Sequence, residues 1–152
     1  MFEDMPRGLR SSLPDGFFHV VSRGVFGAQI YVDEIDRRRF VDLLTENEKA
    51  RRWSCKAYCL MGTHYHLVVE ARRTDLSQGM HQLNARHALA FNRRHRRYGA
   101  LFAERFSVRL IEHEEYLHEA CAYVVLNPVR AGLCDRAEEW PWSYSHFGLE
   151  AA

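Results

Sequence analysis

The order of apolar patterns along this chain constrains its fold more than any other feature. Segments rich in aromatic and β-branched residues alternate with segments whose apolar residues recur at helical spacing. The predicted order is strand, helix, two strands, helix, strand, helix. This order is typical of an antiparallel sheet with helices packed on one face, so we expect an α+β fold of the ferredoxin-like kind.

The first third of the chain contains two predicted strands and one helix. Residues 17–23 form the first strand, and a turn at Gly27 is expected to lead into a short return strand over residues 30–32. Asp33 is a suitable N-cap for a helix that runs to about Arg52. Its apolar stripe would consist of Phe40, Leu43, Leu44 and Ile35.

The middle of the chain predicts a hairpin followed by a second helix. Residues 53–61 and 64–70 are strand-like and are separated by Gly62 and Thr63. Asp75, with Gln78 three residues later, resembles a capping box that opens a helix from Leu76 to about His95.

The last third predicts a strand over residues 102–111 and a third helix. Glu114 opens this helix, which extends through Leu126, and Pro128 limits any continuation. The aromatic-rich tail over residues 140–146 is expected to fold back and pack on the domain rather than to stack on bases.

The length of 152 residues and a hydrophobic content of 47% suit one compact domain. We expect a loose N-terminal leader over residues 1–15 and a single domain over residues 16–147. The sequence has no apolar run long enough to cross a membrane, so a cytoplasmic protein with four reduced cysteines is expected.

The net charge of +1 argues against a protein that coats nucleic acid, but the distribution of charge is informative. Residues 86–97 contain five arginines, and arginine suits bidentate phosphate contacts and stacking on bases. A solvated helix face would explain the same run.

Two spacings point to chemistry. His64 and His66 are two residues apart on a predicted strand, so both imidazoles can reach one ion while Tyr65 points the other way. Tyr123 and Asn127 are four apart on a predicted helix and therefore share one face. Each pattern alone also has an ordinary reading: a chance histidine pair, and a half-buried ring followed by a helix cap.

Five segments taken together resemble the single-tyrosine HUH transposases, most closely the REP-associated tyrosine transposases. The resemblance runs from about Phe18 to Trp142. The segments that carry it are Phe18-His-Val-Val-Ser-Arg-Gly24, Tyr58-Cys-Leu-Met-Gly-Thr-His-Tyr-His-Leu67, Gly99 to Arg105 ahead of Phe106, Tyr123-Val-Val-Leu-Asn-Pro-Val-Arg-Ala-Gly132 and Trp140-Pro-Trp-Ser143.

The resemblance implies a role for each residue of the two pairs. His64 and His66 would match the family's metal ligands, Asn127 the third ligand, and Tyr123 the nucleophile that forms a 5′-phosphotyrosine intermediate. This sequence departs from the family at Tyr65, where an aliphatic residue is usual, and at Thr63, where Asn is commoner.

The implied activity is a metal-dependent endonuclease and strand transferase acting on single-stranded DNA, including hairpin or repetitive elements. Its cofactor would be Mg²⁺ or Mn²⁺, and the protein would be a monomer or a homodimer. Tyr116 is a rival nucleophile that lacks the Asn-Pro context, and His19 reads as structural. The candidate DNA contacts are Arg23, Arg86, Arg93, Arg94, Arg105, Arg109 and Arg130.

Two alternatives stay open at this point. One is a nucleic-acid-binding module on the same fold without catalysis. The other is a relaxase-like or replication-initiator-like HUH nuclease, which would share the chemistry.

Overall fold

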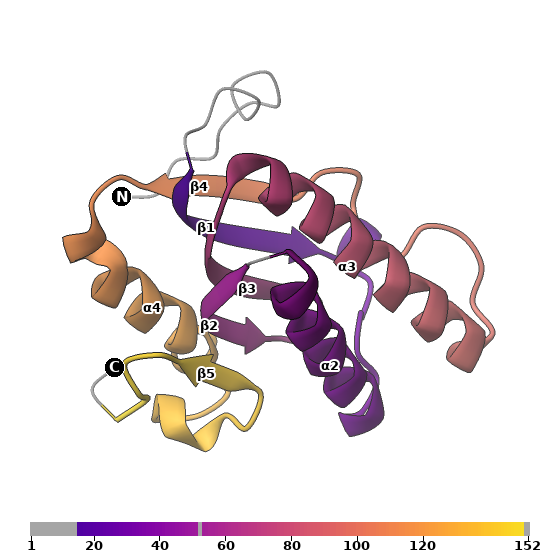
Figure 1. Ribbon diagram of the computed structural model, residues 1–152. Helices are drawn as coiled ribbons and strands as arrows, with labels where there is room; N and C mark the ends of the chain where they lie inside the picture. Colours follow the sequence, from indigo (N-terminus) through magenta and orange to yellow (C-terminus); the bar gives the residue numbers. More distant parts are fainter. Residues whose placement is uncertain (1–14, 52, 151–152) are drawn as a thin grey trace.

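The fold is built on a five-stranded antiparallel sheet, seen in a computed structural model that describes residues 15–150 except residue 52 (Figure 1). The strand order is β4-β1-β3-β2-β5. The strands are β1 (Gly16–Arg23), β2 (Ser54–Leu60), β3 (His64–Ala71), β4 (Ser107–Ile111) and β5 (Ser143–Ser145). The helices are α2 (Glu34–Arg51), α3 (Arg73–His95), α4 (Leu117–Val125) and α5 (Asn127–Arg130), with the 3-10 turns η1 (Val25–Gly27), η2 (Glu114–Tyr116) and η3 (Ala137–Glu139).

The connections between the strands are those of a ferredoxin-like fold. The chain crosses from β1 to β2 through α2 and from β3 to β4 through α3, while β2 and β3 form a hairpin. All four neighbouring strand pairs are antiparallel. The expected α+β class, with an antiparallel sheet and helices packed on it, is therefore confirmed.

One face of the sheet is covered by α2 and α3, which pack against each other (Figure 1). Phe18 and Val20 of β1 and Leu67 of β3 are fully buried there. They share one hydrophobic core with Phe40 of α2 and Met80 of α3. Alternate residues of β1 and β3 thus fix the position of both long helices.

The opposite face is covered by α4, which is where the structure differs from the expectation that helices pack on one face only. Cys59 of β2 and Val68 of β3 are fully buried against Cys121 and Val124 of α4. The central strands are apolar on both faces, and two apolar faces need two covers. In Figure 1, α4 lies away from α2 and α3.

Several local predictions are corrected by tertiary contacts. Residues 30–32 are not in a strand, because Ile30 and Tyr31 are buried in an irregular segment after η1. Helix α3 starts at Arg73 rather than behind a capping box, and Asp75 pairs with Arg72 at 2.7 Å.

Two element ends also move, and one residue drops out of a predicted apolar stripe. The strand expected from residue 102 begins at Ser107, and Phe102 makes only an isolated bridge with Gly24. Pro128 does not stop the helical path, because it occupies the first turn of α5, where no backbone donor is needed. Ile35 is 57% exposed and is not part of the apolar stripe of α2.

The aromatic tail packs on the domain as expected. Its strand β5 pairs with β2, and the indole Nε1–H of Trp140 donates to the Leu60 carbonyl at 3.0 Å. The expected leader lies outside the described residues apart from Asp15, which accepts a hydrogen bond from the Arg73 backbone N–H at 2.9 Å. No helix in the described part of the chain is both long and apolar enough to cross a membrane.

Candidate functional site

The two histidines of the H-x-H segment lie at the start of β3, on the face of the sheet covered by α4. Their ring centroids are 5.3 Å apart at an interplanar angle of 72°. Tyr65 between them points to the other face, where it is fully buried and its hydroxyl lies 2.5 Å from Asn84 Oδ1. The predicted alternation is confirmed, because neighbours on a strand face opposite sides.

A third imidazole, that of His19 on β1, joins the pair. His19 Nε2 is 3.0 Å from His66 Nδ1, and the two rings are stacked with an interplanar angle of 14°. Val21 is the direct cross-strand partner of His66, so His19 and His66 are diagonal neighbours on one face. Both side chains are buried, with 2% and 6% of their surfaces exposed.

Tyr123 reaches the histidines from α4. Its ring stands edge-on to His19 with the centroids 5.8 Å apart, and it is 37% exposed. The Arg130 guanidinium carbon lies 3.9 Å from the centroid of the Tyr123 ring. The ring of Tyr123 thus lies at the boundary between the buried histidines and solvent.

Asn127 follows Tyr123 by one helical turn. Leu126 between α4 and α5 keeps a right-handed backbone, with φ −83° and ψ −1°, so the predicted spacing of Tyr123 and Asn127 is preserved. The Asn127 Nδ2 atom is buried and has no hydrogen-bond partner among the described residues. This amide nitrogen can only donate a hydrogen bond, so a ligand that it meets would be an oxygen acceptor such as water or phosphate, and a cation could be held only by the Asn127 Oδ1 atom.

The electrostatic setting keeps these imidazoles neutral. Burial lowers the pKa of His66 to about 2, with further contributions from His19, His64, Arg23 and Arg130. Burial and Arg23 also lower the pKa of His64. Neutral imidazoles have a free lone pair at neutral pH, which is the state that binds metal ions.

The donor set fits a divalent cation with open positions. Within residues 15–150, apart from residue 52, no group of three or more His, Cys, Asp or Glu side chains is placed to hold a metal ion. The third protein ligand that the family resemblance implies is the Asn127 carboxamide, one helical turn after Tyr123. His66 Nδ1 faces His19, and His64 Nδ1 is 3.2 Å from the Thr63 hydroxyl, so the Nε2 atoms of both remain for an ion.

Three of the seven arginines that were predicted to contact DNA lie beside the histidines and Tyr123. Arg23 is the cross-strand partner of His64, and Arg109 on β4 is the cross-strand partner of His19. Arg130 covers Tyr123 and also donates to the Tyr123 carbonyl at 2.7 Å. Together they surround neutral imidazoles with positive charge, as a phosphate site requires.

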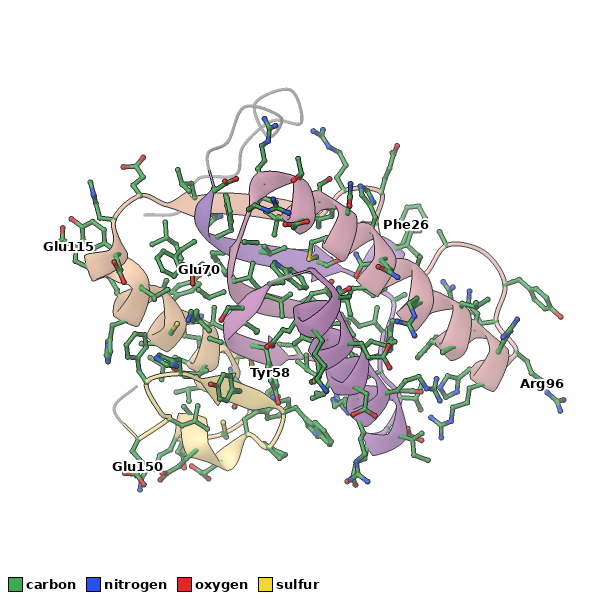
Figure 2. The ribbon with its side chains drawn as sticks, viewed as in Figure 1. Phe26, Tyr58, Glu70, Arg96, Glu115 and Glu150 are labelled. Carbon is green, nitrogen blue, oxygen red and sulfur yellow. The ribbon has the colours of Figure 1, made fainter. Side chains whose placement is uncertain are left out.

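The arginines of α3 are not part of this region, because α3 covers the other face of the sheet. Arg86 pairs with Glu46 on α2 at 2.7 Å, and Arg94 pairs with Asp33 at 2.6 Å. Figure 2 shows Arg96, just beyond α3, on the opposite side of the molecule from Glu115, which precedes α4. Arg93 on α3 and Arg105 before β4 are exposed.

Two further predictions concern Tyr116, the rival nucleophile, and His19, which was expected to be structural. The ring of Tyr116 contacts that of His113, with the centroids 5.7 Å apart, whereas the contact to the histidine group comes from Tyr123. His19, which the sequence alone suggested to be structural, lies inside the site. Only the pairing of β1 with β3 places it there, and no local signal in the sequence reveals that pairing.

Comparisons with known proteins show the family and the fold of this chain. The model of the IS200-like transposase family matches residues 15–127. A Haemophilus influenzae protein that carries the name REP-associated tyrosine transposase is 22% identical over 147 residues, covering 84% of this chain and 83% of that protein. A solved structure of a REP-associated tyrosine transposase bound to a REP hairpin has the same fold, with a TM-score of 0.72 and 15% identity over 86% of this chain and 77% of that one. Since the family model spans most of the sequence, the chain belongs to the IS200-like transposases.

Proposed function

We propose that this protein is a metal-dependent endonuclease and strand transferase that cuts and rejoins single-stranded DNA through Tyr123. The observation that carries the proposal is the meeting of His64, His66 and His19 with the ring of Tyr123 at one place, between β3 and α4. Membership in a transposase family supports it independently.

The covalent step uses the phenol oxygen of Tyr123. This oxygen attacks the phosphorus and gives its proton to water, a new O–P bond forms, and the bond to the 3′-oxygen breaks. The departing 3′-oxygen takes up a proton from water, so the step balances. The products are a 5′-phosphotyrosine and a free 3′-hydroxyl. Because the ester is conserved, a 3′-hydroxyl can attack the phosphotyrosine in the reverse sense and rejoin the strand without another energy source.

The chain's own groups bind and orient the phosphate. Arg130, stacked on Tyr123, and Arg23, opposite His64, would hold the phosphate oxygens near the phenol. The neutral imidazoles of His64 and His66 and the carboxamide of Asn127 would hold Mg²⁺ or Mn²⁺. When bound, such a cation supplies Lewis-acid polarisation of a phosphate oxygen.

The proposed substrate is a single strand or a hairpin end rather than a continuous duplex. An unpaired strand can bend so that one phosphate reaches a half-buried tyrosine, whereas a duplex keeps its phosphates along a stiff surface. The related structure is described as bound to a REP hairpin, which supports a hairpin as the first substrate to test.

A cleavage assay tests the proposal. A labelled single-stranded hairpin incubated with the protein and Mn²⁺ should give a protein–DNA band that survives denaturant and disappears with EDTA. Tyr123→Phe should abolish the band, whereas Tyr116→Phe, the matched control, should retain it.

Two results would contradict the proposal. An unchanged band in Tyr123→Phe would place the nucleophile elsewhere. Binding that persists in EDTA, with no cleavage at any metal concentration, would instead identify a DNA-binding module without catalysis.

A further inference from the structure

The contact between His19 and His66 carries an inference beyond the proposed nucleophile and ligands. A histidine that holds a metal ion through Nε2 must carry its proton on Nδ1. His66 Nδ1 is 3.0 Å from His19 Nε2 inside the protein, so the Nδ1–H of His66 has an acceptor only if His19 presents an unprotonated Nε2. The two tautomers are therefore coupled.

We infer that His19 is a positioning residue, which accepts a hydrogen bond from His66 and thereby fixes the ring and the metal-binding tautomer of His66. This inference rests on the proposed function. The stacked arrangement of the rings, with an interplanar angle of 14°, restricts rotation of His66 in the same way. Residues that hydrogen-bond to a metal-ligating histidine commonly fix its tautomer and the orientation of its ring.

His19 is itself held from two sides. It is 2% exposed, with Arg109 as its cross-strand partner on β4 and Tyr123 edge-on to its ring. One side chain therefore touches both a proposed ligand and the proposed nucleophile. Its replacement should alter metal affinity even in the absence of DNA.

Nuclear magnetic resonance of the wild-type, metal-free protein tests this directly. With ¹⁵N-labelled histidine, His66 should be protonated at Nδ1 and unprotonated at Nε2. A His66 ring protonated at Nε2 would overturn the inference, and this readout requires no variant.

Metal titration supplies the second test. Mn²⁺ affinity, followed by electron paramagnetic resonance, should fall about 10- to 100-fold in His19→Phe, which keeps a ring but has no acceptor. His19→Gln, whose carbonyl oxygen can accept at a similar reach, should restore most of the affinity. Tyr123→Phe, the control, should bind Mn²⁺ as the wild type does.

The outcomes separate two failures. Equal Mn²⁺ affinity in wild type and His19→Phe would overturn the role of His19, even if His19→Phe forms no DNA adduct. If the wild type binds Mn²⁺ no more tightly than His64→Ala does, the proposed metal site fails, and this inference fails with it.

A separate observation concerns Phe26, whose side chain is fully exposed and whose backbone is left-handed, with φ 50° and ψ 35° (Figure 2). A bulky residue other than glycine is strained in the left-handed region of φ/ψ space. A phenyl ring that stays in water buries no apolar surface, so it does not stabilise the fold. Strain of this kind is retained where the surrounding structure imposes it, often at binding sites.

The turn that holds Phe26 is tied to the site. The Gly24 N–H donates to the carbonyl of Thr63, the residue before His64, at 2.8 Å, and the Val25 N–H donates to the Leu101 carbonyl at 2.8 Å. A Cβ atom at Gly24 would lie 2.1 Å from the Ala28 carbonyl oxygen, so only glycine allows this turn.

We propose that Phe26 stacks on an unpaired base of the strand whose phosphate lies at the histidine site, a role that again rests on the proposed function. Exposed Arg23 precedes the turn and can contact the intervening backbone phosphate. Base stacking on an aromatic ring needs no particular base, which suits a contact to single-stranded DNA.

The test uses the Tyr123→Phe background, so that binding is measured without cleavage. Phe26→Asn should weaken affinity for a 2-aminopurine-labelled single strand about 5- to 100-fold and reduce quenching of the probe. Its melting temperature should rise, because Asn tolerates a left-handed backbone. Phe26→Trp should retain binding, and Leu89→Ala, an exposed apolar control on α3, should change nothing.

Wild-type affinity in Phe26→Asn would overturn the stacking role. If the Tyr123→Phe protein itself binds no single-stranded DNA, the proposed function fails rather than the role of Phe26 alone.

Discussion

The Arg130 guanidinium lies over the ring of Tyr123, 3.9 Å from its centroid, and also donates to the Tyr123 carbonyl. The same side chain therefore fixes the ring and places a positive charge beside the proposed nucleophile. That charge would stabilise the negative charge that develops as the phenol oxygen loses its proton.

Arg130→Met should slow formation of the protein–DNA adduct roughly tenfold, as expected for loss of one cation–π contact and one phosphate contact. Arg130→Lys should recover only part of the rate, because lysine keeps the charge but loses the planar stacking. Single-turnover kinetics at saturating Mn²⁺ measures both. An unchanged rate in Arg130→Met would show that this stacking has no part in the reaction.

Replacement of Arg94 should lower the stability of the fold, whereas replacement of its neighbour Arg93 on α3 should not. Arg94 pairs with Asp33 and with the fully buried Asp36, so Arg94→Met should lower stability while the folded protein binds DNA as before. Arg93 is exposed, so Arg93→Met should leave stability unchanged. Thermal unfolding and a DNA-binding titration on both variants provide the comparison. Weaker DNA binding by fully folded Arg94→Met would show that Arg94 contributes to DNA binding.

Asp36 should make stability depend on acid. Burial would raise the pKa of Asp36, but hydrogen bonds from the Val32 N–H, His95 and Arg94 outweigh it and lower the pKa. The hydrogen bond from Arg94 lowers the pKa of Asp33 to about 2. A lowered carboxyl pKa stabilises the fold above the unfolded value near 4, and this stability is lost as pH falls through the folded value.

The unfolding free energy should therefore decline as pH falls from about 4 towards 2. In Asp36→Asn the decline should be smaller, and the variant should be less stable at neutral pH. Asp42→Asn, on the exposed face of α2, is the control. Parallel curves for wild type and Asp36→Asn would contradict the role of this carboxylate.

Tyr65 should matter for stability and not for metal binding. Its hydroxyl bonds Asn84, which in turn donates from Nδ2 to Ser22 Oγ at 3.0 Å, on the face away from the histidines. Tyr65→Phe should lower the free energy of unfolding by about 1 kcal/mol and leave Mn²⁺ affinity unchanged. A large loss of Mn²⁺ affinity would mean that Tyr65, where the family usually has an aliphatic residue, affects the metal site.

Short-range patterns in the sequence were sufficient for the parts of the site that lie within one element. The alternation of a strand places His64 and His66 on one face, and one helical turn relates Tyr123 to Asn127. The hairpin and the three main helices follow from periodicity and turn residues in the same way. These are the features that depend on neighbours along the chain.

Relationships between distant elements could not be predicted from periodicity. His19 meets His66 only through the register of β1 with β3, 47 residues apart. Arg86 and Arg94 of α3 belong to a run that suits phosphate contacts, but the structure pairs them with Glu46 on α2 and with Asp33 before α2. The side of the sheet chosen by α4 depends on burial of both faces of the central strands, which a single segment does not reveal.

The central claim, that Tyr123 is the nucleophile beside the histidine pair, is tested most directly by locating the covalent link. The adduct formed with Mn²⁺ and a hairpin substrate would be digested with nuclease and protease and sequenced by tandem mass spectrometry. We predict a nucleotide joined through its 5′-phosphate to Tyr123. A phosphotyrosine at Tyr116, or a link to any other side chain, would contradict the claim.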